Sequence, residues 1–284
     1  MSKLPPVGAL WIGGSLTWLE QLCLKSFVAH GHETTLFTYG DVKGVPEEVK
    51  VRDGREILDT DNFVRHARTE SVALFSDLFR FHMIKKIPGI IYVDTDVYCL
   101  RPVDMDEQNL FGYESMERER GRLNGAILRL APDSPLLEGM LKFMEDEFPL
   151  PQWLSPAMRR EASERRLDGN PMHVSEMPWG IWGPLGISSV ARQTGEIKHA
   201  KLPEYFYPVH FKERRKLFRR PIEVQRCLTD NSYTIHMWAP IKRFSAKRFA
   251  GLCPPYSYIG HQLALHGVDP ERAPAMHNLA TQQD

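Results

Sequence analysis

Cysteine is scarce in this chain, with four residues among 284 and no Cys-x-x-Cys pair. Such wide spacing excludes a disulfide framework and a structural zinc site, and it is typical of free thiols in a reducing compartment. No apolar run approaches the roughly 20 residues of a membrane-spanning helix, and no signal sequence precedes the first apolar stretch. We therefore expect a cytoplasmic protein whose membrane contact, if any, is peripheral and on the inner face.

A net charge is also absent, because 36 Lys and Arg balance 36 Asp and Glu. This balance argues against a dedicated nucleic-acid-binding protein, which usually carries a basic excess. The chain has neither a GxGxxG nor a GxxxxGK[ST] phosphate loop, and it shows no internal repeat. We expect one domain over residues 1–268, with a charged insertion near 149–178 and a polar tail at 269–284.

Strands and helices alternate along residues 1–60, which is the signature of βαβ units. The pattern predicts an α/β, Rossmann-like fold in which helices flank a mostly parallel central sheet. Further strands are expected at 109–114, 124–131, 206–210 and 233–238. Further helices are expected at 135–148, 156–167 and 256–266, and one more that ends near residue 194.

The most informative stretch is residues 70–104. Apolar residues recur at helical spacing as far as Ile84, Pro88-Gly89 ends the helix, and residues 90–93 form a short buried strand. Asp94 and Asp96 follow this strand directly. Side chains two residues apart on an extended segment point the same way, so both carboxylates can face one cation.

Two carboxylates at the end of a buried strand are costly unless a positive group lies between them. Oxygen ligands suit Mg²⁺ or Mn²⁺, with substrate phosphates and water completing the coordination shell. The alternative is a polar loop in which both aspartates cap backbone N–H groups. The position after a buried strand favours the metal, and we expect Mn²⁺ or Mg²⁺ as the cofactor.

The residues around this pair resemble a known family. Ser76-Asp77-x-x-Arg80, followed by Gly89-Ile-Ile-Tyr92-Val-Asp94-Thr-Asp96, is similar to the DxD motif of GT-A-fold glycosyltransferases of family 32. That family is related to the glucosyltransferase domains of large clostridial toxins. This chain has Pro88-Gly89 where the family has Gly-Gly. The close match covers residues 71–104, and weaker likenesses occur at 10–14, 124–127, 183–184 and 236–238.

The resemblance implies a metal-dependent, retaining glycosyltransferase of the hexosyltransferase type, with a UDP-sugar as the expected nucleotide-sugar donor. It implies catalytic roles for Asp77, Arg80, Asp94 and Asp96, with Asp96 on the metal, Asp94 beside the sugar and ribose, and Asp77 on sugar hydroxyls. The implied donor-binding residues are Trp11, Ile12, Gly13, Ser76, Asp77, Arg80, Tyr92, Asp94, Thr95, Asn124, Gly183, Pro184 and Trp238. The residues alone leave a plain helical ion pair open for Asp77 and Arg80, which lie one turn apart.

His236 is the expected third metal ligand beside Asp94 and Asp96, because GT-A enzymes often supply a last metal or diphosphate contact late in the chain. Imidazole suits Mn²⁺ better than Mg²⁺. A histidine buried in the core is the alternative. Trp238, Trp179 and Trp182 could stack on a sugar, although burial in the core explains them nearly as well.

The expected acceptor is a glycan, a polysaccharide or a lipid-linked saccharide, as in polysaccharide biosynthesis. A basic run could bring the protein to an anionic membrane surface or bind an anionic acceptor; its residues are Lys212, Arg214, Arg215, Lys216, Arg219 and Arg220. A solvated helix or loop is the alternative.

Three other functions compete with sugar transfer. A Mg²⁺-dependent nucleotidyltransferase also holds metal on paired aspartates, but the segment Trp11-Ile-Gly-Gly-Ser15 has no Lys or Arg to grip phosphates. A glycosidase needs two carboxylates that flank the bond, and no metal. A non-catalytic sugar-nucleotide-binding module is disfavoured by the presence of all four implied catalytic residues.

Overall fold

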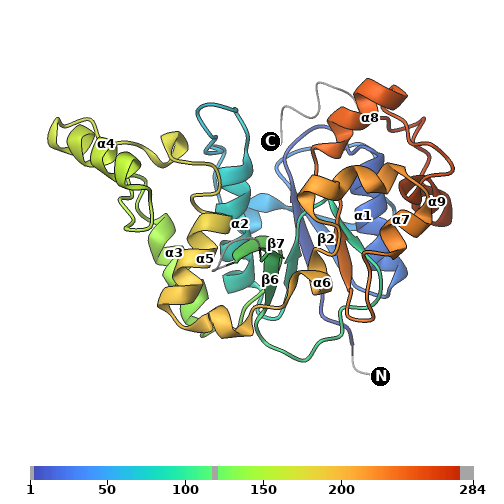
Figure 1. Cartoon of the computed structure of the whole chain (residues 1–284), viewed down its shortest axis with the longest axis horizontal. Helices are drawn as coiled ribbons and strands as arrows, with labels where there is room; N and C mark the ends of the chain where they lie inside the picture. The colour runs from blue at the N-terminus through green and yellow to red at the C-terminus, as the bar shows by residue number, and fades with distance from the viewer. Residues whose placement is uncertain (1–2, 117–120, 276–284) are drawn as a thin grey trace.

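A computed structural model describes residues 3–116 and 121–275, and it has a six-stranded sheet between two layers of helices (Figure 1). The strand order is β3-β2-β1-β4-β7-β6. Strands β1 to β4 run parallel, whereas β7 is antiparallel to both β4 and β6. The predicted α/β fold with a mostly parallel sheet is therefore confirmed. The strands are β1 (Val7–Trp11), β2 (Thr34–Thr38), β3 (Lys50–Asp53), β4 (Ile91–Val93), β6 (Leu110–Ser115) and β7 (Arg122–Arg129).

Helices cover both faces of the sheet. On one face lie α2 (Ala73–Lys86), α3 (Pro135–Met144) and α5 (Pro184–Gln193). On the other side lie α1 (Trp18–Ala29), α6 (Pro203–Phe206), α7 (Pro221–Gln225), α8 (Ile241–Phe249) and α9 (Tyr258–Leu265). A further helix, α4 (Pro156–Leu167), and short 3₁₀ helices at 54–56, 174–176, 196–199 and 211–218 complete the chain.

The central strands carry apolar side chains on both faces of the sheet, as strands covered by helices on both faces must. Leu10, Phe37 and Tyr92 pack under α2, while Ala9, Leu36 and Val93 pack in the opposite core. Helix α1 begins with a capping box in which the Thr17 side chain accepts from Leu19 N–H and Glu20 reaches back to the Thr17 N–H.

A second, two-stranded sheet joins the DxD turn to the end of the chain. Strand β5 (Val97–Cys99) pairs antiparallel with β8 (Thr234–His236), and Val97 lies opposite His236. The register therefore brings His236 beside Asp96, although the two are 140 residues apart in sequence.

One predicted strand is wrong. Residues 206–210 form no strand, because Pro203 starts the short helix α6, which ends at Phe206. Phe206 and Tyr207 are fully buried against the sheet, and that burial produces the apolar run. Pro208 has no N–H to donate to a neighbouring strand.

Helix α8 was not predicted, and its sequence IKRFSAKRF is mostly polar.

The insertion near 149–178 contains α4 at the predicted residues 156–167, and Figure 1 shows this helix projecting away from the sheet. Only Ala162 of α4 is buried. In the predicted tail, Ala275 is buried and its N–H donates to Gly251 O; residues 276–284 lie outside the described part of the chain. Within the described ranges, no helix has the length and hydropathy to cross a membrane.

Candidate active site

A cavity of about 590 Å³ opens where β1 and β4 end. Such an edge, at the carboxyl ends of parallel strands, is where open α/β sheets bind ligands. Most of the residues singled out from the sequence line it: Ile12, Ser76, Asp77, Arg80, Tyr92, Asp94, Thr95, Asp96, Asn124, Pro184, His236 and Trp238. Trp11, Gly13 and Gly183 do not line it.

The turn that carries both aspartates is held on two sides. The Asp94 N–H donates to Ala126 O of β7 at 2.8 Å, and the Val97 N–H donates to Asp94 O at 3.1 Å. On the far side, the Met237 N–H donates to Asp96 O at 2.8 Å. The backbone between β4 and β5 is thus fixed by contacts to two distant segments, and the two carboxylates point into the cavity.

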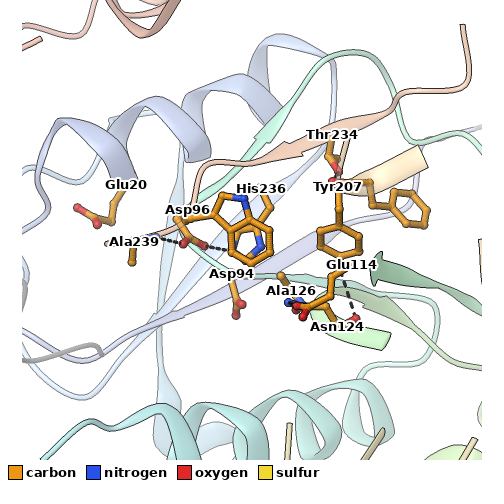
Figure 2. A network of polar contacts seen from close by, with 12 residues as sticks. Glu20, Asp94, Asp96, Glu114, Asn124, Ala126, Tyr207, Thr234, His236 and Ala239 are labelled. Atoms are coloured by element: carbon orange, nitrogen blue, oxygen red, sulfur yellow. Dashed lines mark hydrogen bonds and ion pairs between the residues drawn. The ribbon is translucent and has the colours of Figure 1, made fainter. Parts of the chain in front are cut away.

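Asp94, Asp96 and His236 form a compact group in which one ligand atom from each lies within 4.8 Å of the others (Figure 2). His236 Nε2 is 3.1 Å from Asp96 Oδ1. Asp96 Oδ2 accepts from the Ala239 N–H at 2.6 Å. Two carboxylates and one imidazole are a donor set that a divalent ion such as Mn²⁺ accepts. The three residues predicted as metal ligands are therefore brought together.

The Asp96–His236 contact is charge-stabilised. Burial raises the pKa of Asp96, but the charge and hydrogen bond of His236 and the Ala239 N–H outweigh it, so this pKa lies below its ordinary value. Burial lowers the pKa of His236, and Asp96 raises it by more. His236 Nδ1 is buried and has no hydrogen-bond partner among the described residues. Asp96 and His236 thus stabilise each other's charged forms, and a divalent ion bound there would take the place of the imidazole proton.

Trp238 follows His236 with a φ of 65°, in the left-handed region that non-glycine residues rarely adopt. Its indole packs on the His236 ring at a centroid distance of 3.9 Å, and its Nε1 donates to Val209 O at 3.0 Å. These contacts offset the strain. The backbone turn that they hold is the one that aims the Ala239 N–H at Asp96.

A second charged group lies beside the first. The Arg80 guanidinium is 3.3 Å from Asp77 Oδ1 and 3.1 Å from Asp94 Oδ1, and it lies 4.7 Å from the centre of the Tyr92 ring. The Tyr92 hydroxyl also donates to Asp94 Oδ1 at 2.8 Å. The Asp77–Arg80 pair is buried and extends to Asp94, so it is more than a surface pair within one helix.

Burial has the largest effect on Asp77 and raises its pKa to about 7, because it disfavours the charged carboxylate. Arg80 lowers this pKa and Asp94 raises it. Two glycines leave room for the group. A Cβ on Gly125 would lie 2.3 Å from an Arg80 nitrogen, and a Cβ on Gly183 would lie 2.8 Å from Asp77 Oδ2. Gly183 therefore lies behind Asp77 and not in the cavity wall.

The tryptophans divide between cavity and core. Trp11 is 3% exposed and packs in the core below Lys242, whose Nζ is 5.5 Å from the centre of its ring. Trp182 is also buried. Trp179 is 44% exposed, lines the cavity and meets the His66 ring edge-on at 5.4 Å. Of the tryptophans considered for sugar stacking, Trp179 and Trp238 reach the cavity.

Several cavity residues were missed at the sequence level. Glu114 ends a predicted strand, which was the available signal for it, and Arg122 begins β7. Ala239 acts through its backbone N–H, for which the sequence offers no signal. Phe211 and Arg243 reach the cavity from segments that are distant in sequence from the DxD motif.

Residues 178–249 match the family model described as the alpha 1,4-glycosyltransferase conserved region. Similar solved structures include the PaToxG glycosyltransferase, with 12% identity over 69% of this chain and 72% of that one, and a TM-score of 0.41. A structure described as a transferase has 11% identity and a TM-score of 0.34, over 63% of this chain and 88% of its own. A mutant transferase structure with two Cys-to-Ser changes has 12% identity and a TM-score of 0.36, over 61% of this chain and 88% of its own.

No curated protein matches the chain in sequence. The family match includes His236, Trp238 and Ala239, which meet the Asp94–Asp96 turn in the cavity. Together with the aspartate pair, the match supports a glycosyltransferase of the GT-A type.

Proposed function

We propose that this glycosyltransferase transfers a sugar from a nucleotide sugar, with UDP as the nucleotide, to a glycan or a lipid-linked saccharide, with retention of configuration. The observation that carries the proposal is the convergence of Asp94, Asp96 and His236 at the cavity. A donor set of two carboxylates and an imidazole fits Mn²⁺ better than Mg²⁺. When bound there, the ion would neutralise the negative charge that develops on the departing diphosphate.

The residues around this group have distinct tasks in the proposal. Asp96, His236 and Asp94 would hold the metal, and the Ala239 N–H keeps the Asp96 carboxylate turned towards it. Asp94, fixed by Arg80 and Tyr92, accepts hydrogen bonds from the donor sugar and ribose. Asp77 accepts from sugar hydroxyls on the other side of Arg80. Holding the donor in one orientation is itself a large part of catalysis.

The nucleotide would lie at the β1 end of the cavity. Ile12 lines this end directly, while Trp11 supports it from the core and Gly13 follows in the turn. Ser76, Thr95 and Trp238 complete the donor side of the wall. The acceptor side begins at Pro184 and Trp179, which extend the wall away from the metal group. The protein as a whole is proposed to be one cytoplasmic domain over residues 1–268.

A thermal-shift panel of nucleotide sugars tests the donor. We expect a UDP-sugar at about 100 times its Kd to raise the melting temperature by about 5 °C or more, and only with Mn²⁺ present, because the diphosphate and the carboxylates repel each other without a cation. Nucleoside triphosphates are the control. Equal stabilisation by triphosphates, with no response to any nucleotide sugar, would identify a nucleotidyltransferase. Stabilisation without turnover would identify a binding module.

Peripheral contact with an anionic membrane is the second part of the proposal. Residues 211–226 and 241–249, here called the basic surface, contain ten Lys and Arg besides the buried Lys242, against two Asp and Glu, in a chain with 36 of each. The two segments are adjacent, since the Arg215 guanidinium lies 5.1 Å from the Phe244 ring. Phe211 and Arg243 of the same segments line the cavity. A bilayer docked on the basic surface would lie close to the cavity mouth.

Membrane binding can be tested with a matched pair of variants. Arg219→Gln with Arg220→Gln removes two exposed charges of the basic surface and should weaken binding to phosphatidylserine vesicles about thirtyfold, at roughly 1 kcal/mol per residue. Arg159→Gln with Arg160→Gln removes two exposed charges from α4, which Figure 1 shows far from α8, and should change little. Binding to neutral vesicles that is equally tight and insensitive to salt contradicts the proposal.

A further inference from the structure

Glu114 is a buried carboxylate that the proposed donor site does not use. It lies near the end of β6, is 6% exposed, and lines the cavity. A buried carboxylate is costly unless it is paired and hydrogen-bonded. Its partners are therefore informative about what it does in the cavity wall.

Two neighbours hold the Glu114 carboxylate in place, and one of them, Asn124, is labelled beside it in Figure 2. The Asn124 amide nitrogen donates to Glu114 Oε2 at 2.6 Å, and the Arg122 guanidinium contacts Oε1. Asn124 is itself oriented, because its Oδ1 accepts from the Ala126 N–H at 2.8 Å. The amide of Asn124 is thus occupied in positioning Glu114, whose carboxylate is the hydrogen-bond acceptor that these residues present to the cavity, beside the Arg122 guanidinium.

The carboxylate keeps hydrogen-bonding capacity for a ligand. Two carboxylate oxygens offer about four acceptor positions. Asn124 takes one of those on Oε2, and the contacts of Arg122 are all to Oε1. A hydroxyl group that donates to Oε2 would complete the shell. Sugars present such donors, and a carboxylate accepts from them more strongly than a neutral amide does.

The order of the strands indicates whether the donor sugar or the acceptor saccharide would lie beside Glu114. Because β6 and β4 are both antiparallel to β7, the carboxyl ends of β1, β4 and β6 meet at one edge with the start of β7. Along this edge the proposed nucleotide end lies at β1 and the metal group at β4. Strand β6 is two positions further, roughly 10 Å away at the usual strand spacing. A separation of that size between the strands leaves room for the donor sugar on the β4 side and for a second saccharide on the β6 side, beside Glu114.

We propose that Glu114 binds the acceptor saccharide, accepting a hydrogen bond from one of its hydroxyl groups, and that Arg122 and Asn124 position its carboxylate. The inference rests on the proposed sugar transfer and adds a residue that recognises the acceptor. The ligand class is a neutral saccharide ring with a free hydroxyl near the anomeric carbon of the donor.

Glu114→Gln separates acceptor binding from donor chemistry. The probes are the UDP-sugar from the thermal-shift panel and p-nitrophenyl glycosides of the common hexoses and N-acetylhexosamines. We expect the KM for the best glycoside to rise about tenfold to a hundredfold, the range for losing a hydrogen bond to a charged group. The KM for the donor and the rate of its hydrolysis by water should stay unchanged. Glu107→Gln, which removes an exposed pair with Lys201 outside the cavity, is the matched control.

Arg122→Gln distinguishes ligand binding from a structural role. It removes the ion pair but leaves the Glu114 carboxylate, held by Asn124, in the wall, so most of the acceptor affinity should remain. Equal defects in Glu114→Gln and Arg122→Gln would overturn the inference, as would a changed donor KM or an unchanged acceptor KM. A wild-type enzyme that hydrolyses the donor but uses no glycoside also overturns it. Absence of donor hydrolysis itself would refute the proposed function, and the inference with it.

Discussion

Replacement of Asp96 by Asn is expected to lower sugar transfer at least about a thousandfold, among the largest effects that loss of one electrostatic group has on turnover. Asp96 is the residue on which the site converges: His236 contacts one of its oxygens and the Ala239 N–H donates to the other. An amide in its place offers a metal one neutral oxygen and loses the charge. Turnover of the UDP-sugar and Mn²⁺ binding, measured by titration calorimetry, are the two readouts.

Asp104→Asn is the control for this change. Asp104 is an exposed aspartate that comes after β5, the strand that follows Asp96, and it lies outside the cavity. It should leave both turnover and Mn²⁺ affinity unaltered. If Asp96→Asn retained wild-type Mn²⁺ affinity, the metal would not lie on Asp96. If it retained turnover with lost Mn²⁺ binding, the reaction would not depend on the metal.

Arg80→Met is expected to destabilise the fold by about 3–5 kcal/mol, the usual result of removing one partner from a buried ionic group. The substitution leaves Asp77 and Asp94 facing each other without their cation. The loss should be larger at pH 8 than at pH 5. A folded-state pKa of about 7 for Asp77, above its ordinary 3.8, means that the folded protein holds this proton better. Stability attributable to Asp77 therefore falls as the pH rises through this range. Arg80 lowers this pKa, so its removal raises the pKa further and makes the fall steeper in Arg80→Met than in the wild type.

Urea unfolding of Arg80→Met at both pH values measures the effect. Asp77→Asn added to Arg80→Met removes one of the two stranded charges, so the double variant should recover part of the stability at pH 8 and depend less on pH. A loss below about 1 kcal/mol would mean that water reaches Asp77 and Asp94 in the folded protein. A double variant less stable than Arg80→Met would assign the loss to packing, since charge would then not be its cause.

Local patterns in the sequence predicted the parts of the fold that depend on near neighbours. The strand before Asp94 is a short apolar run that begins after the Pro88-Gly89 turn, and α4 begins at Pro156 after the capping residue Ser155. The strand predicted at residues 206–210 was wrong, because the burial of Phe206 and Tyr207 depends on contacts with distant segments. An apolar pair packs equally well from a loop and from a strand, so the pattern alone could not distinguish them.

The same distinction separates the site residues. Asp77, Arg80, Asp94 and Asp96 occur within one stretch. Helical spacing pairs Asp77 with Arg80 and strand spacing pairs Asp94 with Asp96, whereas the resemblance to the DxD family is what placed the two pairs in one site. Glu114 and Ala239 were missed for different reasons. Glu114 gains its position only when β6 pairs with β7, and Ala239 contributes a backbone group whose direction is set by the left-handed Trp238. Both depend on tertiary structure.

The pairing of β5 with β8 also bears on the order in which the protein is assembled. During synthesis, Asp94 and Asp96 leave the ribosome about 140 residues before His236, and the contact with Ala239 arrives later still. The nascent sheet can pair β1, β2 and β4 early, since these need only the first third of the chain. The group of Asp94, Asp96 and His236 closes only after the central strands have been made. A partly synthesised chain therefore carries both aspartates of the motif without the imidazole that meets them in the folded protein.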